Sequence, residues 1–315
     1  MSDVLTPGYD ENDAISFNEA YAKSIGWYRK LPAKSFEKYP GLSEDPVSGP
    51  DYAKKTFASS VLKFQVDHFP SEQDHDGKLG NDTWSALLET YPQTGVRKYI
   101  HNGVEVIADP SRTSAIKTWR DKGGYDLHPD GDFRKPKGGA VRKLDRIVLH
   151  WGGTSARRCW RALQNRNLSS HFGVDEVVIY QWLDLNFKAW HAGKANTGSI
   201  GIDICQQPTV SFFEHYRKRG FNDIKVVKND SKPLRGHKEV ITLHEKTAQS
   251  TRDLVVDLCE LFDIPLRVPR NTDGSYCYEV INWESFRGVV GHFHSSPGKW
   301  DPAPFWSQIF DPIFE

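Results

Sequence analysis

The chain has 315 residues, of which 41 are Lys or Arg and 41 are Asp or Glu, so its formal net charge is zero. A chain without bulk positive charge is a poor candidate for a nucleic-acid-binding protein. No apolar run approaches the roughly 20 residues that span a bilayer, and the first residues lack the basic and apolar regions of a signal peptide. We therefore expect a protein made in the cytoplasm without a membrane anchor, built from one large domain or two smaller ones.

The cysteines give no sign of a disulfide framework. They are widely spaced and form no C-x-x-C pair: Cys159, Cys205, Cys259 and Cys277. We interpret them as reduced core residues.

Three helices are predicted in the N-terminal part, over residues 12–31, over 52–69 and from Asn81 onward. Apolar residues recur there at three- and four-residue steps, as in Phe57, Val61 and Phe64. An Asp-Gly turn at residues 76–77 precedes the third helix, and Asn81 is suited to its N-cap. The pattern predicts a small all-α domain over residues 1–95.

This N-terminal part resembles a known family. Residues 61–65 (VLKFQ), 76–80 (DGKLG) and 83–87 (TWSAL) follow the F-Q, D-G-x-x-G, T-W-x-A-L order of the three-helix peptidoglycan-binding domains. The resemblance covers residues 12–92 and implies that this domain binds peptidoglycan.

The next segment, residues 96–140, has weak patterns and is predicted to be a linker that packs on the following domain. Within it, residues 104–107 are predicted as a strand and residues 114–120 as a short helix.

From residue 141 to 315 the sequence predicts an α/β domain. Short β-branched runs at residues 146–149, 176–180 and 199–204 indicate strands, and residues 246–262 carry a helical apolar stripe. Strands mixed with helices imply a central mixed sheet flanked by helices.

Residues suited to binding a metal gather near the end of this domain. Residues 289–302 contain His292, Lys299 and Asp301, and His150 follows the apolar run 147–149. Two histidines and one carboxylate are a common catalytic zinc set, which leaves the fourth position for water. His294 is an alternative ligand to His292.

Four patches in this domain resemble the zinc-dependent N-acetylmuramoyl-L-alanine amidases of type 2, whose fold is shared with the peptidoglycan recognition proteins. They are residues 150–154 (HWGGT), 189–193 (AWHAG), 196–203 (NTGSIGID) and the stretch from Gly291-His292 to 299–302 (KWDP). The resemblance implies a Zn²⁺ enzyme that cuts the amide bond between the lactyl group of N-acetylmuramic acid and L-alanine.

The resemblance also implies roles for single residues. His150, His292 and Asp301 would be the zinc ligands, and Lys299 would stabilise the oxyanion. Asp203 stands where the family usually has a glutamate that orients or deprotonates the water, and it is one methylene shorter.

Further residues are expected to contact the substrate, namely Trp151, Trp190 and His191. In the amidase-type phage lysozymes a tyrosine precedes a strand histidine, whereas here Ser170 precedes His171, so that route is absent.

Other interpretations stay open at this point. A non-catalytic peptidoglycan receptor could share the fold, and a hydrolase could use Cys205 as nucleophile with His150 or His191. The setting is either a phage endolysin or a bacterial amidase effector that is exported. In each case we expect a monomer that acts on the cell wall after release or export.

Overall fold

The computed structural model describes residues 9–25, 31–32, 34–91, 98–109, 112, 114–128, 140–176, 178–229 and 238–314. The chain divides into two compact units, residues 1–98 with 103–110, and residues 99–102 with 111–315. Among the described residues, no helix combines the length and the apolar character needed to cross a bilayer.

The first unit contains the predicted helices as α1 (Glu11–Ile25), α3 (Asp51–His68) and α4 (Asn81–Thr90). The last turn predicted for the first helix, residues 26–30, lies outside the described residues. A short helix α2 (Ser35–Lys38) and two 3₁₀ turns, Pro40–Ser43 and Glu72–Asp74, lie between the long helices. The N-cap of α4 is Gly80 rather than Asn81, which is the first helical residue.

One buried glutamine connects α3 to the loop before α4. The Gln65 side-chain amide donates hydrogen bonds to Asp76 Oδ1 (2.9 Å), the Lys78 carbonyl (3.1 Å) and Thr83 Oγ1 (3.0 Å). Its Oε1 accepts the backbone N–H of Gly77 at 2.8 Å. Gly77 has φ +70°, a left-handed conformation that glycine adopts without strain. The residues of the F-Q and D-G-x-x-G motifs therefore pack together where α3 meets the loop before α4, and we call this place the packed corner of the first unit.

Two short strands follow along the chain, β1 (Lys98–His101) and β2 (Val104–Ile107). The predicted strand at residues 104–107 is confirmed.

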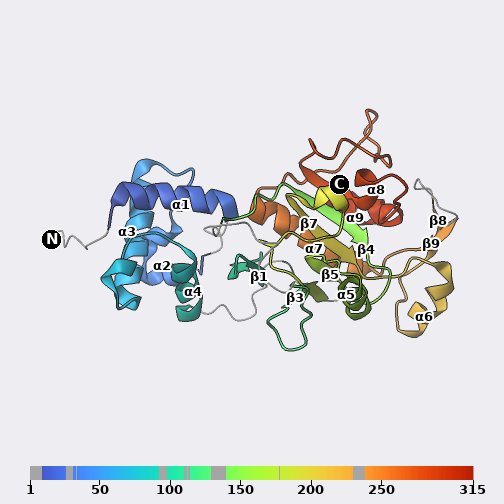
Figure 1. Ribbon diagram of the computed structural model, residues 1–315, viewed down its shortest axis with the longest axis horizontal. Coiled ribbons are helices and arrows are strands. Elements are labelled where there is room, and N and C mark those ends of the chain that lie inside the picture. The colour runs from blue at the N-terminus through green and yellow to red at the C-terminus, as the bar shows by residue number, and fades with distance from the viewer. Residues whose placement is uncertain are drawn as a thin grey trace. The chain divides into compact units, whose positions relative to one another are not determined.

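The second unit is built on a six-stranded sheet in the order β10-β4-β7-β5-β6-β3 (Figure 1). The strands are β3 (Ala115–Thr118), β4 (Arg146–Trp151), β5 (Phe172–Val174), β6 (Val178–Gln181), β7 (Ser199–Ile204) and β10 (Gly288–Gly291). β10, β4, β7 and β5 run parallel, β6 is antiparallel to β5, and β3 is parallel to β6. The predicted mixed sheet is confirmed.

The segment predicted as a linker differs from expectation. Residues 114–120 hold strand β3, which pairs with β6, and not the predicted short helix. β-branched Ile116 and Thr118 suit a strand, and the pairing with β6 supplies hydrogen bonds that a helix of so few residues could not match. Residues 129–139, also part of the predicted linker, lie outside the described residues.

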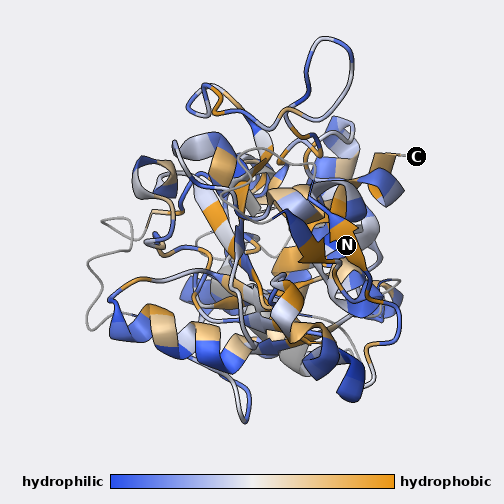
Figure 2. Cartoon of the chain, turned by 90° about the vertical axis from the view of Figure 1, so that its right-hand side faces the viewer, coloured by the Kyte–Doolittle hydropathy of each residue, from blue (hydrophilic) through white to orange (hydrophobic). Residues whose placement is uncertain are grey.

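Helices flank this sheet, and the strands carry mostly hydrophobic residues (Figure 2). The long helix α7 (Glu245–Phe262) matches the predicted helix and contacts β5 and β6. The other helices are α5 (Ala156–Asn165), α6 (Phe213–Lys218), α8 (His292–Ser295) and α9 (Trp306–Phe314). Strands β8 (Val226–Lys228) and β9 (Glu239–Ile241) form a separate antiparallel pair.

Candidate metal centre

Three adjacent strands end at the candidate residues. His150 and Asp203 are register partners on β4 and β7. On the other side of β4, Gly291 of β10 pairs with Leu149, so His292 follows at the level of His150. Because β10, β4 and β7 are parallel, their carboxyl ends lie at one edge of the sheet, which is the usual place for a site in such folds.

The predicted metal ligands converge at this edge. His150 Nδ1 lies 3.1 Å from His292 Nδ1, and Asp301 Oδ2 lies 3.1 Å from His292 Nδ1 and 3.5 Å from His150 Nδ1. Within the described part of the chain, these three residues form a group that could hold a metal ion.

The spacing of these atoms fits a zinc ion. Zinc lies about 2.0–2.1 Å from nitrogen and oxygen donors, and a tetrahedron of such bonds has edges of about 3.3 Å. The three separations of 3.1, 3.1 and 3.5 Å are close to that edge length. Two imidazoles and one carboxylate are also a donor set that suits zinc.

The Asp301 carboxylate is held in its charged form. Burial alone would raise its pKa, but the contacts with His150 and His292 outweigh burial and hold the pKa of Asp301 well below its ordinary value. Burial lowers the pKa of His292, although Asp301 opposes this effect. A charged carboxylate beside a neutral imidazole is the protonation state that a metal requires of its ligands.

Asp203 lies beside this group in a different environment. Its side chain is buried, and burial raises the pKa of its carboxyl group. A Cβ atom on Gly152, the residue after β4, would lie 3.3 Å from the Asp203 Cβ and 3.0 Å from Cys159 Sγ. The glycine therefore leaves space for Asp203 beside His150.

His191 also lies at the group. Its Nδ1 is 2.7 Å from His150 Nε2, and its Nε2 is 3.1 Å from the hydroxyl of Ser199. Burial lowers the pKa of His191 well below its ordinary value, so the ring is neutral near pH 7. Ser199 and Asn196 were not predicted as partners of His191, although both lie in the NTGSIGID patch at residues 196–203.

The other predicted residues differ in exposure. Lys299 is exposed, and its charge contributes slightly to the lowered pKa of His292, which burial dominates. Trp190 is 41% exposed. Trp151 is half-buried; its indole N–H donates to the Gln206 carbonyl, and its ring meets that of Trp300 edge-on with centroids 4.8 Å apart.

Two other histidines have structural hydrogen bonds. His294 is buried, its Nδ1 accepts the Gly291 N–H at 2.9 Å, and its Nε2 lies 2.7 Å from the Cys277 carbonyl. His171 is similarly buried between the Gly201 N–H (3.0 Å) and the Phe187 carbonyl (3.0 Å). Of the two alternatives at residues 292 and 294, the geometry favours His292 as the ligand.

The geometry disfavours Cys205 as a nucleophile. Burial raises the pKa of its thiol well above the ordinary value, and the thiol is directed at the Asp203 carbonyl, 3.4 Å away. Only the thiolate is an effective nucleophile.

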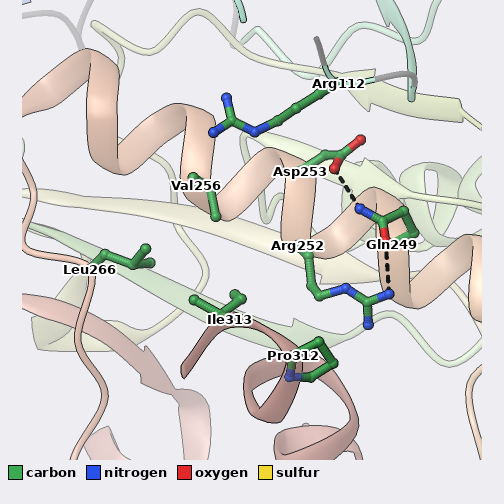
Figure 3. A pocket seen from close by; sticks show the side chains of 8 residues that line it. All are labelled: Arg112, Gln249, Arg252, Asp253, Val256, Leu266, Pro312 and Ile313. Carbon is green, nitrogen blue, oxygen red and sulfur yellow. Dashed lines mark hydrogen bonds between the residues drawn. The ribbon is translucent and has the colours of Figure 1, made fainter. Parts of the chain in front are cut away.

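A cavity of about 510 Å³ lies elsewhere in the second unit (Figure 3). Gln249 bridges two of its charged residues, donating to Asp253 Oδ1 at 2.8 Å and accepting from Arg252 at 2.9 Å. Arg112 binds Asp257 at 2.6 Å and Glu260 at 2.8 Å. The charged side chains that line the cavity already have hydrogen-bond or ion-pair partners, so the cavity is a weaker candidate than the histidine group.

In a comparison with known families, residues 140–304 match the model of the N-acetylmuramoyl-L-alanine amidases. This is just over half of the 315 residues. The matched range contains His150, Asp203, His292 and Asp301.

Two curated relatives come from Bacillus subtilis strain 168. The amidase CwlH is 34% identical over 89 residues, which cover 26% of this chain and 36% of CwlH. The amidase XlyA is 41% identical over 66 residues, which cover 19% of this chain and 22% of XlyA. The alignments thus span about a third of CwlH and about a fifth of XlyA.

Among solved structures, the chain matches the catalytic domain of XlyA, with 22% identity, a TM-score of 0.35 and coverage of 63% of this chain and 95% of that domain. Drosophila peptidoglycan recognition protein SD has 13% identity, a TM-score of 0.35 and coverage of 62% and 93%.

Proposed function

Because this chain belongs to the N-acetylmuramoyl-L-alanine amidase family, we propose that it hydrolyses the amide bond between N-acetylmuramic acid and the L-alanine of peptidoglycan stem peptides. The observation that carries the proposal is the convergence of His150, His292 and Asp301 beside the buried Asp203. Three metal donors and a separate carboxylate are what metal-assisted amide hydrolysis requires.

His150, His292 and Asp301 would hold a zinc ion through Nδ1, Nδ1 and Oδ2, the atoms that face one another. Zinc, when bound, would polarise the scissile carbonyl and make water a nucleophile near pH 7. The carboxylate of Asp301 offsets one of the two positive charges and is kept ionised by its histidine neighbours.

Asp203 would accept the proton of the attacking water. Its raised pKa makes it a stronger base than an exposed aspartate, and its place opposite His150 in the sheet puts it next to the proposed metal. The proton would then pass to the leaving amine of L-alanine. Lys299 would donate to the oxyanion that develops on the carbonyl, a contribution worth about 3–4 kcal/mol for one donor elsewhere.

Trp151, Trp190 and His191 would contact the substrate. The half-buried and exposed indoles of the two tryptophans provide apolar faces on which sugar rings or peptide can pack.

A defined muropeptide tests the proposed reaction. Cleavage should release a peptide with a new N-terminal L-alanine amine and leave the sugar intact, as followed by amine labelling and mass spectrometry. New reducing sugar ends without new alanine amines would overturn the amidase assignment. Binding of the muropeptide without cleavage would favour the receptor interpretation.

We also propose that residues 1–95 bind peptidoglycan and hold the second unit on the wall. The packed corner around Gln65 and Gly77 supports the resemblance on which this rests. Tethering raises the local concentration of substrate for the attached catalytic unit. The protein would thus be a modular lytic enzyme, either a phage endolysin or an exported bacterial effector, that acts on the cell wall.

A further inference from the structure

The ring of His191 lies between a proposed metal ligand and a serine. Its Nδ1 is 2.7 Å from His150 Nε2, and its Nε2 is 3.1 Å from Ser199 Oγ. The two rings meet edge-on, with centroids 4.9 Å apart and planes at 84°. Both nitrogens of His191 therefore have partners at hydrogen-bond distance.

These contacts define one consistent set of protons. His150 directs Nδ1 toward His292 and Asp301, so as a metal ligand it must carry its proton on Nε2. That N–H then donates to Nδ1 of His191, which leaves the His191 proton on Nε2, where it donates to Ser199. We propose that His191 is a positioning residue, which fixes the tautomer and the ring orientation of His150 and thereby strengthens metal binding.

The side chain of Asn196 holds the backbone of His191 in place. Asn196 Oδ1 accepts the backbone N–H of His191 at 3.0 Å and that of Ala192 at 2.6 Å. This clamp fixes the start of the loop on which the His191 ring is carried. Asn196 thus links the patch at residues 189–193 to the patch at residues 196–203.

A glycine on β7 makes room for the ring. A Cβ atom on Gly201 would lie 2.8 Å from His191 Cγ and 2.9 Å from its Nδ1, closer than side chains approach one another. Because Ser199 and Gly201 lie two residues apart on one strand, they point to the same face. Gly201 therefore supports the ring, while Ser199 binds its far nitrogen.

The first test is the zinc affinity of the full chain without substrate, measured by competition with a chromophoric chelator. His191→Phe keeps the ring bulk but removes both nitrogens, and it should weaken zinc binding 10- to 100-fold, the range found for such supporting partners. His191→Asn keeps an acceptor near the position of Nδ1 and should restore most of the affinity. The exposed His215→Phe is the matched control and should leave affinity unchanged.

A double-mutant cycle provides a readout that general destabilisation would not give. Gly201→Ala should weaken zinc binding in the wild-type background by displacing the His191 ring. In the His191→Ala background the same change should have little further effect, because the ring is gone. Equal effects in both backgrounds would overturn the proposal.

This inference rests on the proposed zinc site, and the two can fail separately. Absence of zinc binding by the wild-type chain would overturn the proposed function. Zinc binding that is equally tight in the wild type and in His191→Phe would overturn only the positioning role of His191.

Discussion

At the scale of single residues, the proposed chemistry depends on two carboxylates whose environments push their pKa values apart. Contacts with His150 and His292 outweigh burial and lower the pKa of Asp301, whereas burial raises the pKa of Asp203. Such a separation is typical of sites in which one acid binds a metal and another transfers a proton. In the proposed mechanism, the environment rather than the residue type would distinguish the metal ligand Asp301 from the base Asp203.

Asp203→Asn keeps the size of the side chain and removes its basicity. We expect kcat on a muropeptide to fall about 10²- to 10⁴-fold, the usual contribution of a general base, while zinc content is unchanged. Asp203→Glu should stay within about tenfold of the wild type, because it keeps a base at the position. Full activity of Asp203→Asn would contradict the assignment of Asp203 as the base.

A second prediction concerns His101, which is buried and whose ring nitrogens have no hydrogen-bond partner among the described residues. Burial lowers its pKa from 6.5 to about 4, so below pH 6.5 the unfolded chain binds a proton that the folded chain does not. The folded state therefore has its full stability, as far as His101 is concerned, above pH 6.5, and it loses stability as the pH falls toward 4. The loss is about 2 kcal/mol at pH 5 and about 3 kcal/mol at pH 4.

His101→Leu removes this titration and two unbonded polar atoms. We therefore expect the variant to be at least as stable as the wild type at pH 7, and to lose less stability between pH 7 and pH 5. Urea unfolding at the two pH values measures the difference, with the exposed His215→Leu as control. The same loss in His101→Leu and wild type would refute this explanation.

At the scale of elements, the strongest sequence patterns were reliable. Strands β4 and β7 were predicted from short β-branched runs, and helix α7 was predicted from its apolar stripe. Helix α5 was not predicted, although Ala156, Cys159, Trp160 and Leu163 follow the helical spacing, because the arginines among them mask the stripe. Strand β5 has only three residues, which is too short for a pattern to emerge.

The candidate residues of the site could be predicted from the sequence, but the contacts among them could not. His150, His292 and Asp301 could be identified as candidate metal ligands from their motifs. Their meeting could not be derived from local sequence, because 142 residues separate His150 from His292 and only the pairing of β10 with β4 joins them. The close approach of His191 to Gly201 likewise could not be predicted from the sequence, because only the fold brings the two residues together.

An element-scale prediction tests the corner of the first unit. Gln65→Ala leaves the buried Gly77 N–H without its partner and removes the two N–H groups that the three acceptors share. We expect the first unit to lose about 2–4 kcal/mol of stability, as measured by chemical denaturation. The exposed Gln73→Ala should change little, and equal stability of the two variants would refute the role of Gln65.

At the scale of the whole molecule, two compact units on one chain suggest a division of work between binding and cleavage. The chain has no net charge to attract it to an anionic wall, so retention there would depend on specific contacts. The first unit is the proposed source of those contacts.

Deletion of residues 1–95 tests this division. The truncated chain should bind and lyse intact walls less well, because tethering is lost. Its activity on soluble muropeptides should match that of the full chain, measured by release of alanine amines. Equal losses on both substrates would contradict tethering.

We propose that a zinc ion held by His150, His292 and Asp301 drives amide cleavage. The most direct measurement is zinc content together with muropeptide cleavage, in the wild type and in Asp301→Ala, with the exposed Asp273→Ala as control. We expect about one zinc ion for each wild-type and Asp273→Ala chain, and loss of both metal and alanine amines in Asp301→Ala. Cleavage by a wild-type chain that contains no zinc would contradict it.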